Sequence, residues 1–139
     1  MLKACFGRQK HCNLYFTACL FLLIGSTAHA QVQSTIQTPP AAAIASLSDE
    51  KSLSDLALAN LVASNCKIDG LSHGDTGLVA GTAQAVASHL NLSMDDYFAS
   101  YVRPAMMKLT NPDACLDHAP MTISMVEKLK ELGGRVLAE

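Results

Sequence analysis

Two cysteines, Cys66 and Cys115, constrain the fold of this chain more than any other feature of its sequence. The chain has five cysteines, and the other three lie in a segment that we expect to be removed. A single pair in an exported protein has one connectivity, so we expect a disulfide; two free thiols or two metal ligands are the alternatives. Closing a loop of about 50 residues removes roughly 4 kcal/mol of unfolded-chain freedom in the entropic model.

The first 30 residues have the three-part pattern of a secretory signal peptide. Lys3, Arg8 and Lys10 precede an apolar run from Leu14 to Ile24, and the segment ends in Ala-His-Ala at positions 28–30. We expect cleavage after this triplet, which places the mature protein in the periplasm or outside the cell. No run approaches the 18 or so apolar residues that span a bilayer, so we expect no stable membrane anchor.

Loss of this segment leaves an acidic chain. All twelve acidic residues but only seven of the ten basic residues follow position 30, which gives a formal net charge of −5. Because Lys and Arg are not concentrated against phosphates, we expect no nucleic-acid partner. Protonating the carboxylates and the three remaining histidines changes the charge to +10, and the resulting self-repulsion favours opening in acid.

Apolar residues recur at helical spacing from residue 47 onwards, and no segment alternates as a strand would. The sequence therefore predicts an all-α fold, a small bundle of about four helices pinned by one disulfide. Residues 31–46 carry no charge and are rich in Gln, Ser, Thr, Pro and Ala, so we expect a disordered leader before a helical domain over 47–139.

The expected helices have recognisable ends. The first runs from about Asp49 to Asn65, and the second starts near Asp75, the expected cap, and continues to about residue 90. A capping-box pattern at Ser93 opens the third, which Pro104 should kink. The fourth is expected to start near Pro120 and to stop at the two glycines 133–134, with the second cysteine in a loop or fresh turn before it.

Small residues gather on the second expected helix between Gly77 and Ala87. Short side chains let another helix approach closely. We therefore expect close packing at this face, either within the chain or in a homodimer.

Two histidine–aspartate pairs are candidate ligands for a divalent metal ion. His73 precedes Asp75 by two residues, and Asp117 precedes His118 directly, so a disulfide would draw the two pairs toward each other. The simpler interpretation is that one carboxylate caps a helix and that both pairs lie at the surface. The spacing is not that of a known metal motif, so we expect no cofactor.

A second metal hypothesis concerns copper. His118, Met121 and Met125 fall on one face of the last expected helix, and imidazole with thioethers suits Cu(I). Methionines at this spacing also fill irregular gaps between packed helices, which is the simpler explanation.

Catalytic motifs are missing from the sequence. Asp95 and Asp96 are adjacent, so on a helix they point about 100° apart and cannot face each other across a substrate. Negative charge in a first helical turn accounts for both. Neither a nucleophile elbow nor a phosphate-binding loop is present. We therefore expect a protein that is not an enzyme and that acts on protein partners, through residues that the sequence does not identify.

The order of these features resembles the periplasmic acid-stress chaperones of the HdeA type. The likeness rests on Cys66 at a helix end, a small-residue helix over 75–87, Cys115, and a last helix around 126–132. It covers residues 48–132 and implies a stress protein that acid opens so that it can bind unfolded proteins. Related exported folds also serve as immunity proteins against cell-wall enzymes through a binding face alone. A periplasmic metal-binding protein with His/Asp or His/Met ligands is the alternative function.

Overall fold

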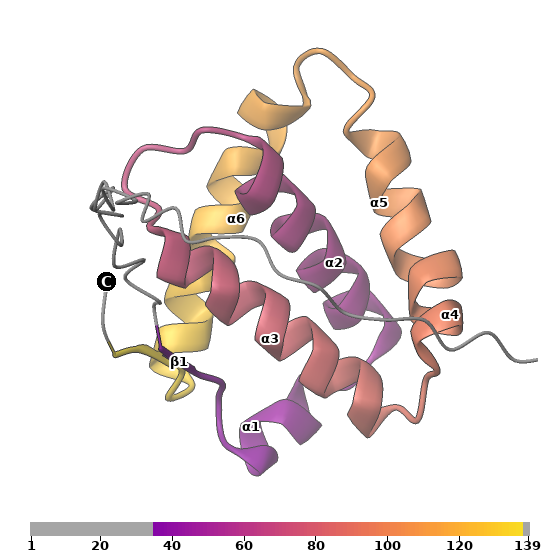
Figure 1. The fold of residues 1–139 in the computed structure, drawn as a ribbon, viewed down its shortest axis with the longest axis vertical. Coiled ribbons are helices and arrows are strands. Elements are labelled where there is room, and N and C mark those ends of the chain that lie inside the picture. The colour runs from indigo at the N-terminus through magenta and orange to yellow at the C-terminus, as the bar shows by residue number, and fades with distance from the viewer. Residues whose placement is uncertain (1–34, 138–139) are drawn as a thin grey trace, which may run out of the picture. The chain divides into compact units, whose positions relative to one another are not determined.

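The computed structural model describes residues 35–137, so the expected signal peptide and the first residues of the leader lie outside the described part. The described chain is all-α, as the sequence predicts, apart from two short strands that pair with each other (Figure 1). In chain order the elements are β1 Ile36–Gln37, α1 Ala41–Ser46, α2 Glu50–Asn65, α3 His73–His89, α4 Met94–Tyr97, the π-helical stretch η1 Phe98–Val102, α5 Arg103–Lys108, α6 Ala114–Glu131 and β2 Arg135–Val136. Among these helices none has the length and apolar character needed to cross a membrane.

The helix α2 is the centre of the fold and packs against α3, α6, η1 and α5. Asp49 caps its N-terminus by accepting a hydrogen bond from the Ser52 N–H at 2.9 Å. Four consecutive side chains of α2 are buried, so neighbours must contact it on more than one side. Its buried residues are Leu53, Leu56, Ala57, Leu58, Ala59 and Val62.

The helix α3 begins two residues earlier than predicted, and its cap is Ser72 rather than Asp75. Ser72 Oγ accepts the Asp75 N–H at 3.1 Å, and the Asp75 carboxylate accepts the Ser72 N–H at 3.1 Å. The two residues thus form a reciprocal capping box, in which Asp75 is the third helical residue.

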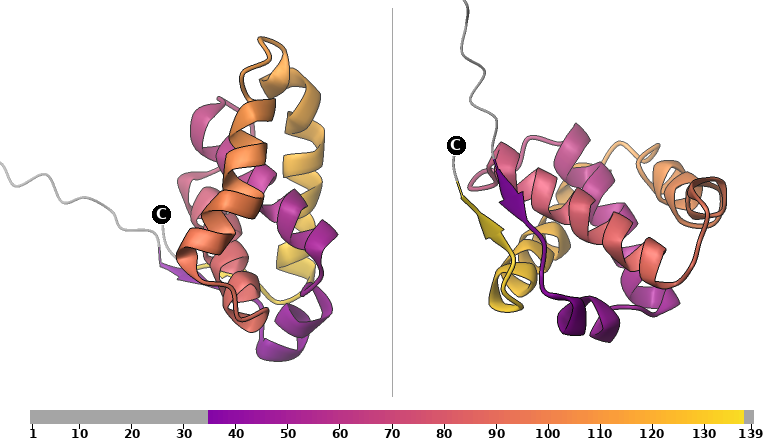
Figure 2. Two further views of the ribbon diagram at one scale, coloured as in Figure 1. Left: turned by 90° about the vertical axis from the view of Figure 1, so that its right-hand side faces the viewer. Right: turned by 60° about the horizontal axis from the view of Figure 1, so that its bottom comes forward.

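The segment from Met94 to Lys108 is one helical path made of α4, η1 and α5, which we call the α4–α5 arm (Figure 2, left). Ser93 caps it as expected, with its Oγ accepting the Asp96 N–H at 3.1 Å. Pro104 does not end the path. Proline has no N–H to donate, and its ring crowds the carbonyl four residues back. The wider π-helical turn of η1 lies directly before α5, the helix that contains Pro104.

The last helix, α6, starts at Ala114, and the prediction of a start near Pro120 is wrong. Pro120 lies inside the helix, where it forgoes one backbone hydrogen bond. The first turn is held instead by the buried side chain of Ala114 and by Cys115, which lies in the helix and not in a preceding loop. Tertiary contacts therefore outweigh the local preference of proline for a helix start.

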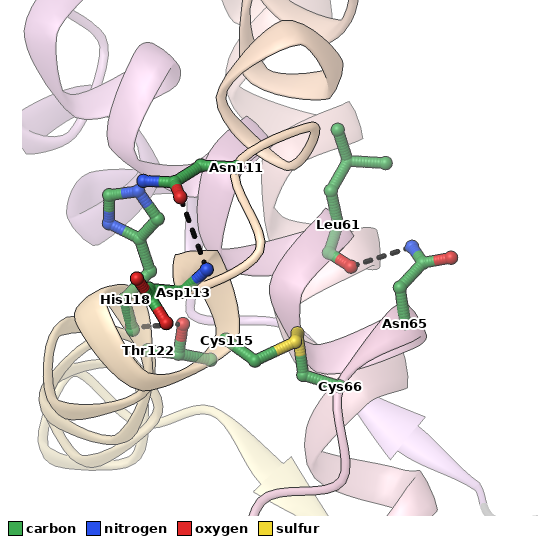
Figure 3. Close-up of a disulfide and its surroundings, with 8 residues drawn as sticks. All are labelled: Leu61, Asn65, Cys66, Asn111, Asp113, Cys115, His118 and Thr122. Carbon is green, nitrogen blue, oxygen red and sulfur yellow. Dashed lines mark hydrogen bonds between the residues drawn. A yellow bond between two sulfur atoms is a disulfide. The ribbon is translucent and has the colours of Figure 1, made fainter.

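A disulfide joins Cys66, directly after α2, to Cys115 in the first turn of α6, which confirms the expected pairing (Figure 3). The two Cα atoms are 5.6 Å apart, within the usual range for a disulfide. The link fixes the end of the central helix to the start of the last one.

Residues 36–46 are ordered, which corrects the expectation of a disordered leader up to residue 46. They form β1 and α1, and Ile44 of α1 is buried in the core. A Cβ added to Gly77 would lie 3.3 Å from Ile36 Cγ2, and one added to Gly81 would lie 3.0 Å from Ile36 Cδ1 and 3.2 Å from Thr38 Cγ2. Part of the small-residue face of α3 is thus covered by the chain's own N-terminal segment, not by a helix.

The C-terminal end of α6 returns the chain to this N-terminal segment. Gly133 adopts a φ of +95°, and the Gly134 N–H donates to the Leu129 carbonyl at 2.8 Å, which ends the helix at the predicted glycines. The following strand β2 pairs antiparallel with β1, with Ile36 opposite Val136 (Figure 2, right). Two strands absent from the sequence prediction therefore join the two ends of the described chain.

A valine at position 81 tests whether the N-terminal segment packs against α3 at Gly81. We expect Gly81→Val to push Ile36 and Thr38 off α3, because even a Cβ there would be in tight contact with both side chains. The Leu137 N–H, which donates to the Thr35 carbonyl at 2.8 Å, should then exchange with solvent at least about tenfold faster. Hydrogen exchange by NMR measures this rate.

Gln84→Val is the matched control, because it places the same β-branched side chain at an exposed position of α3. It should leave exchange at Leu137 unchanged. Equal effects of the two substitutions on exchange at Leu137 would show that the N-terminal segment does not pack against Gly81.

Candidate functional site

The four residues of the His/Asp metal hypothesis are not gathered into a site. His73 is the exposed first residue of α3, and Asp117 and His118 lie in the first turns of α6. Asp75 is buried and engaged by other residues of the fold. Within residues 35–137, no three His, Cys, Asp or Glu side chains are placed to hold a metal ion together.

The residues of the copper hypothesis lie along α6. Met121 and Met125 are half-buried and pack against the main hydrophobic cluster of the fold. Their thioethers therefore contribute to packing between helices, the role that the sequence analysis weighed against copper binding.

The Asp75 carboxylate joins the start of α3 to the end of α6. Its Oδ1 lies 2.6 Å from Lys130 Nζ, and its Oδ2 accepts hydrogen bonds from the Ser72 N–H and hydroxyl. Burial by itself would raise the pKa of Asp75, but Lys130 and Ser72 together outweigh it and hold the pKa below the ordinary value of 3.8. The sequence indicated a helix cap here. It did not reveal the partner Lys130, which lies 55 positions after Asp75 in the chain.

The inner side of the α4–α5 arm anchors it to the core. Tyr97 is 6% exposed and stacks on Tyr101 with ring centroids 6.1 Å apart. Burial raises the pKa of Tyr97. The other end of the arm is held differently, because Ala105 of α5 packs with Leu58 and Val62 in a small cluster of its own.

The exposed surface of the arm carries large apolar side chains among charged ones such as Asp95, Asp96 and Lys108. Within the described chain, four of the six exposed large apolar side chains lie on these fifteen residues: Met94 (66% exposed), Phe98 (46%), Met106 (48%) and Met107 (69%). Arg103 lies over the Phe98 ring at 5.9 Å from its centroid. Exposed apolar side chains gathered on one short segment mark binding sites more often than single scattered ones do.

An open groove of about 390 Å³ lies between α2 and α5, lined by Leu61, Asn65, Met106 and Leu109. Leu61 and Asn65 come from the last turns of α2, and Asn65 directly precedes the disulfide-bonded Cys66 (Figure 3). The Asn65 amide donates to the Leu61 carbonyl at 2.7 Å, so its polar group is turned to its own helix. The groove is therefore lined mainly by apolar side chains, and Met106 brings one exposed methionine of the arm into it.

We define the candidate functional site as the four exposed apolar side chains of the arm together with this groove. Sequence reasoning placed the arm residues on a helix but did not separate those that face the core from those that face solvent. The signal in the sequence was the helical spacing of Phe98, Met106 and Met107 relative to the core-facing tyrosines. The π-helical turn changes this spacing and so obscures the signal. Comparisons with models of protein families, with curated proteins and with solved structures found no match for this chain.

The Asp75–Lys130 ion pair predicts a specific pH dependence of stability. Because folding lowers the pKa of Asp75, the pair contributes stability above pH 4, and this contribution is lost as the pH falls through the folded-state pKa. Asp75→Asn should therefore lower the free energy of unfolding at pH 7, on the order of 1 to 2 kcal/mol. The difference from the unmodified protein should shrink between pH 4 and pH 2, as urea unfolding at each pH would measure.

Asp55→Asn provides the matched control. Asp55 pairs with Lys51 at 2.7 Å on the exposed side of α2, where an ion pair contributes little. It should change stability by less than about 0.5 kcal/mol at pH 7. An Asp75→Asn effect that stays constant down to pH 2 would contradict the assignment.

Proposed function

We propose that this protein is a small exported protein-binding module that holds apolar segments of unfolded proteins on the α4–α5 arm. The observation that carries the proposal is the set of four exposed apolar side chains on the arm. A surface of this kind is costly to leave in water, and unfolded chains expose apolar side chains that can cover it. The periplasm or the space outside the cell is the proposed location.

The chemistry of the arm suits variable partners better than one rigid partner. Three of its four exposed apolar residues are methionines, whose flexible thioethers adapt to differently shaped side chains. The groove beside Met106 offers depth for one larger side chain. An inhibitor or immunity protein that recognises a single partner is the narrower form of the same proposal.

Acid is the proposed trigger, as in the chaperones of the HdeA type. Between neutral pH and pH 2 the chain after residue 30 changes from a formal charge of −5 to +10, so its parts repel one another. Over the same range the Asp75–Lys130 pair between α3 and α6 is lost. Both changes loosen helix packing and add core surface to the apolar surface of the arm.

Client protection in acid tests this function. The purified protein should bind a hydrophobic dye more strongly at pH 2.5 than at pH 7, and it should suppress aggregation of acid-unfolded citrate synthase on neutralisation. Phe98→Ser combined with Met107→Ser should reduce protection severalfold, because both side chains are exposed on the arm and their loss removes binding surface. Light scattering measures the protection.

Leu137→Ser is the matched control, because Leu137 is 58% exposed and directly follows β2, outside the arm. It should protect as well as the unmodified protein does. A protein that stays closed at pH 2.5, or that opens without protecting the client, would contradict the proposal. One dominant partner in a cross-linked extract that competes with the client would favour the inhibitor form.

The disulfide should decide whether acid opening is reversible. With the link intact, the end of α2 and the start of α6 remain together when the helices loosen. The double variant Cys66→Ser/Cys115→Ser should lose about 4 kcal/mol of stability by the entropic model. It should refold more slowly after neutralisation than the disulfide-bonded protein, as stopped-flow circular dichroism would measure. Equal refolding rates would show that the disulfide does not act as a tether.

A further inference from the structure

The described methionines fall into two groups with different surroundings. Met94, Met106 and Met107 are 66%, 48% and 69% exposed, and all three lie on the α4–α5 arm. Met121 and Met125 lie on α6, half-buried against the main cluster. The thioethers that solvent reaches most readily are therefore those on the candidate binding surface.

We propose that Met94, Met106 and Met107 form a modification site, at which peroxides convert the thioethers to methionine sulfoxide and thereby switch off binding by the arm. In each reaction the sulfur lone pair attacks one oxygen of hydrogen peroxide. The S–O bond forms as the O–O bond breaks, and the departing oxygen leaves as water after proton transfer. The sulfur loses two electrons and the peroxide gains them.

Exposure selects the site because the peroxide must come within reach of the sulfur lone pair. Half-buried sulfurs such as those of Met121 and Met125 are shielded by the side chains they pack against. The disulfide at Cys66 and Cys115 leaves no free thiol among residues 35–137 to compete for the oxidant. The arm methionines are thus the most accessible reductants in the described part of the chain.

Oxidation changes the property on which binding rests. A sulfoxide is a strongly polar group, so it converts a flexible apolar side chain into one that prefers water. Met106 lines the groove with Leu61 and Leu109, so a sulfoxide at this position adds a polar group to a mainly apolar lining. The exposed side chains of Met94 and Met107 lose apolar contact surface in the same way. This regulatory step rests on the proposed function of the arm.

Peptide mapping by mass spectrometry tests the site independently of binding. In the folded protein treated with hydrogen peroxide at neutral pH, the three arm methionines should oxidise at least about fivefold faster than Met121 and Met125. Unfolding in urea should remove this difference, because all five sulfurs then become equally accessible. Uniform oxidation of the five methionines in the folded protein would overturn the proposal.

Binding is measured on the same samples. Protection of acid-unfolded citrate synthase should fall severalfold after selective oxidation and should return after treatment with methionine sulfoxide reductases. The variant Met94→Leu/Met106→Leu/Met107→Leu keeps the apolar surface without oxidisable sulfur, so it should protect both before and after peroxide treatment. An equal loss of protection in this variant would overturn the regulatory role.

The two proposals fail in different ways. If the untreated protein gives no protection, the function proposed for the arm is wrong, and the mapping still decides whether the arm is the modification site. If selective oxidation leaves protection unchanged, the switch is wrong while the function of the arm stands.

Discussion

The fold depends on the burial of α2 on more than one side. Its residues from Leu56 to Ala59 are consecutive and all buried, and a helix meets that condition only when neighbours pack around it. The helices α3 and α6 and the arm supply those neighbours. The disulfide fixes the end of this central helix to the first turn of α6.

The two ends of the described chain meet on the far side from the arm's loop into α6, and they do so through small residues. Glycines 77 and 81 allow the N-terminal segment to lie against α3, and the glycines after α6 turn the chain so that β2 reaches β1. The Asp75–Lys130 pair ties the start of α3 to the last turn of α6. Three different interactions thus link α3, α6 and the N-terminal segment.

The arm differs from this part of the molecule in its contacts with the other helices and in the apolar side chains that it exposes. Its main partner in the fold is α2, and its α5 half packs on a small apolar cluster separate from the main one. Three exposed methionines and an exposed phenylalanine lie on it. The binding function that we propose, and its proposed suppression by oxidation, rest on two of these properties: apolar exposure and thioether chemistry.

The sequence alone determined the helical class, the helix from about Asp49 to Asn65, the capping pattern at Ser93, the stop at the two C-terminal glycines and the disulfide. These features depend on local spacing, on side chains that bond to nearby backbone groups, or on the single available cysteine pairing. Local signals failed where a distant contact outweighed them.

Pro120 indicated a helix start, but α6 begins six residues earlier, where Ala114 is buried and Cys115 forms the disulfide. The uncharged leader indicated disorder, but its Ile36 and Thr38 fit against glycines some 40 positions away. The Lys130 partner of Asp75 and the outward face of the arm likewise arise only when separate helices pack. Tertiary structure decided these points, because each depends on surfaces that the folded chain brings together and that no local pattern records.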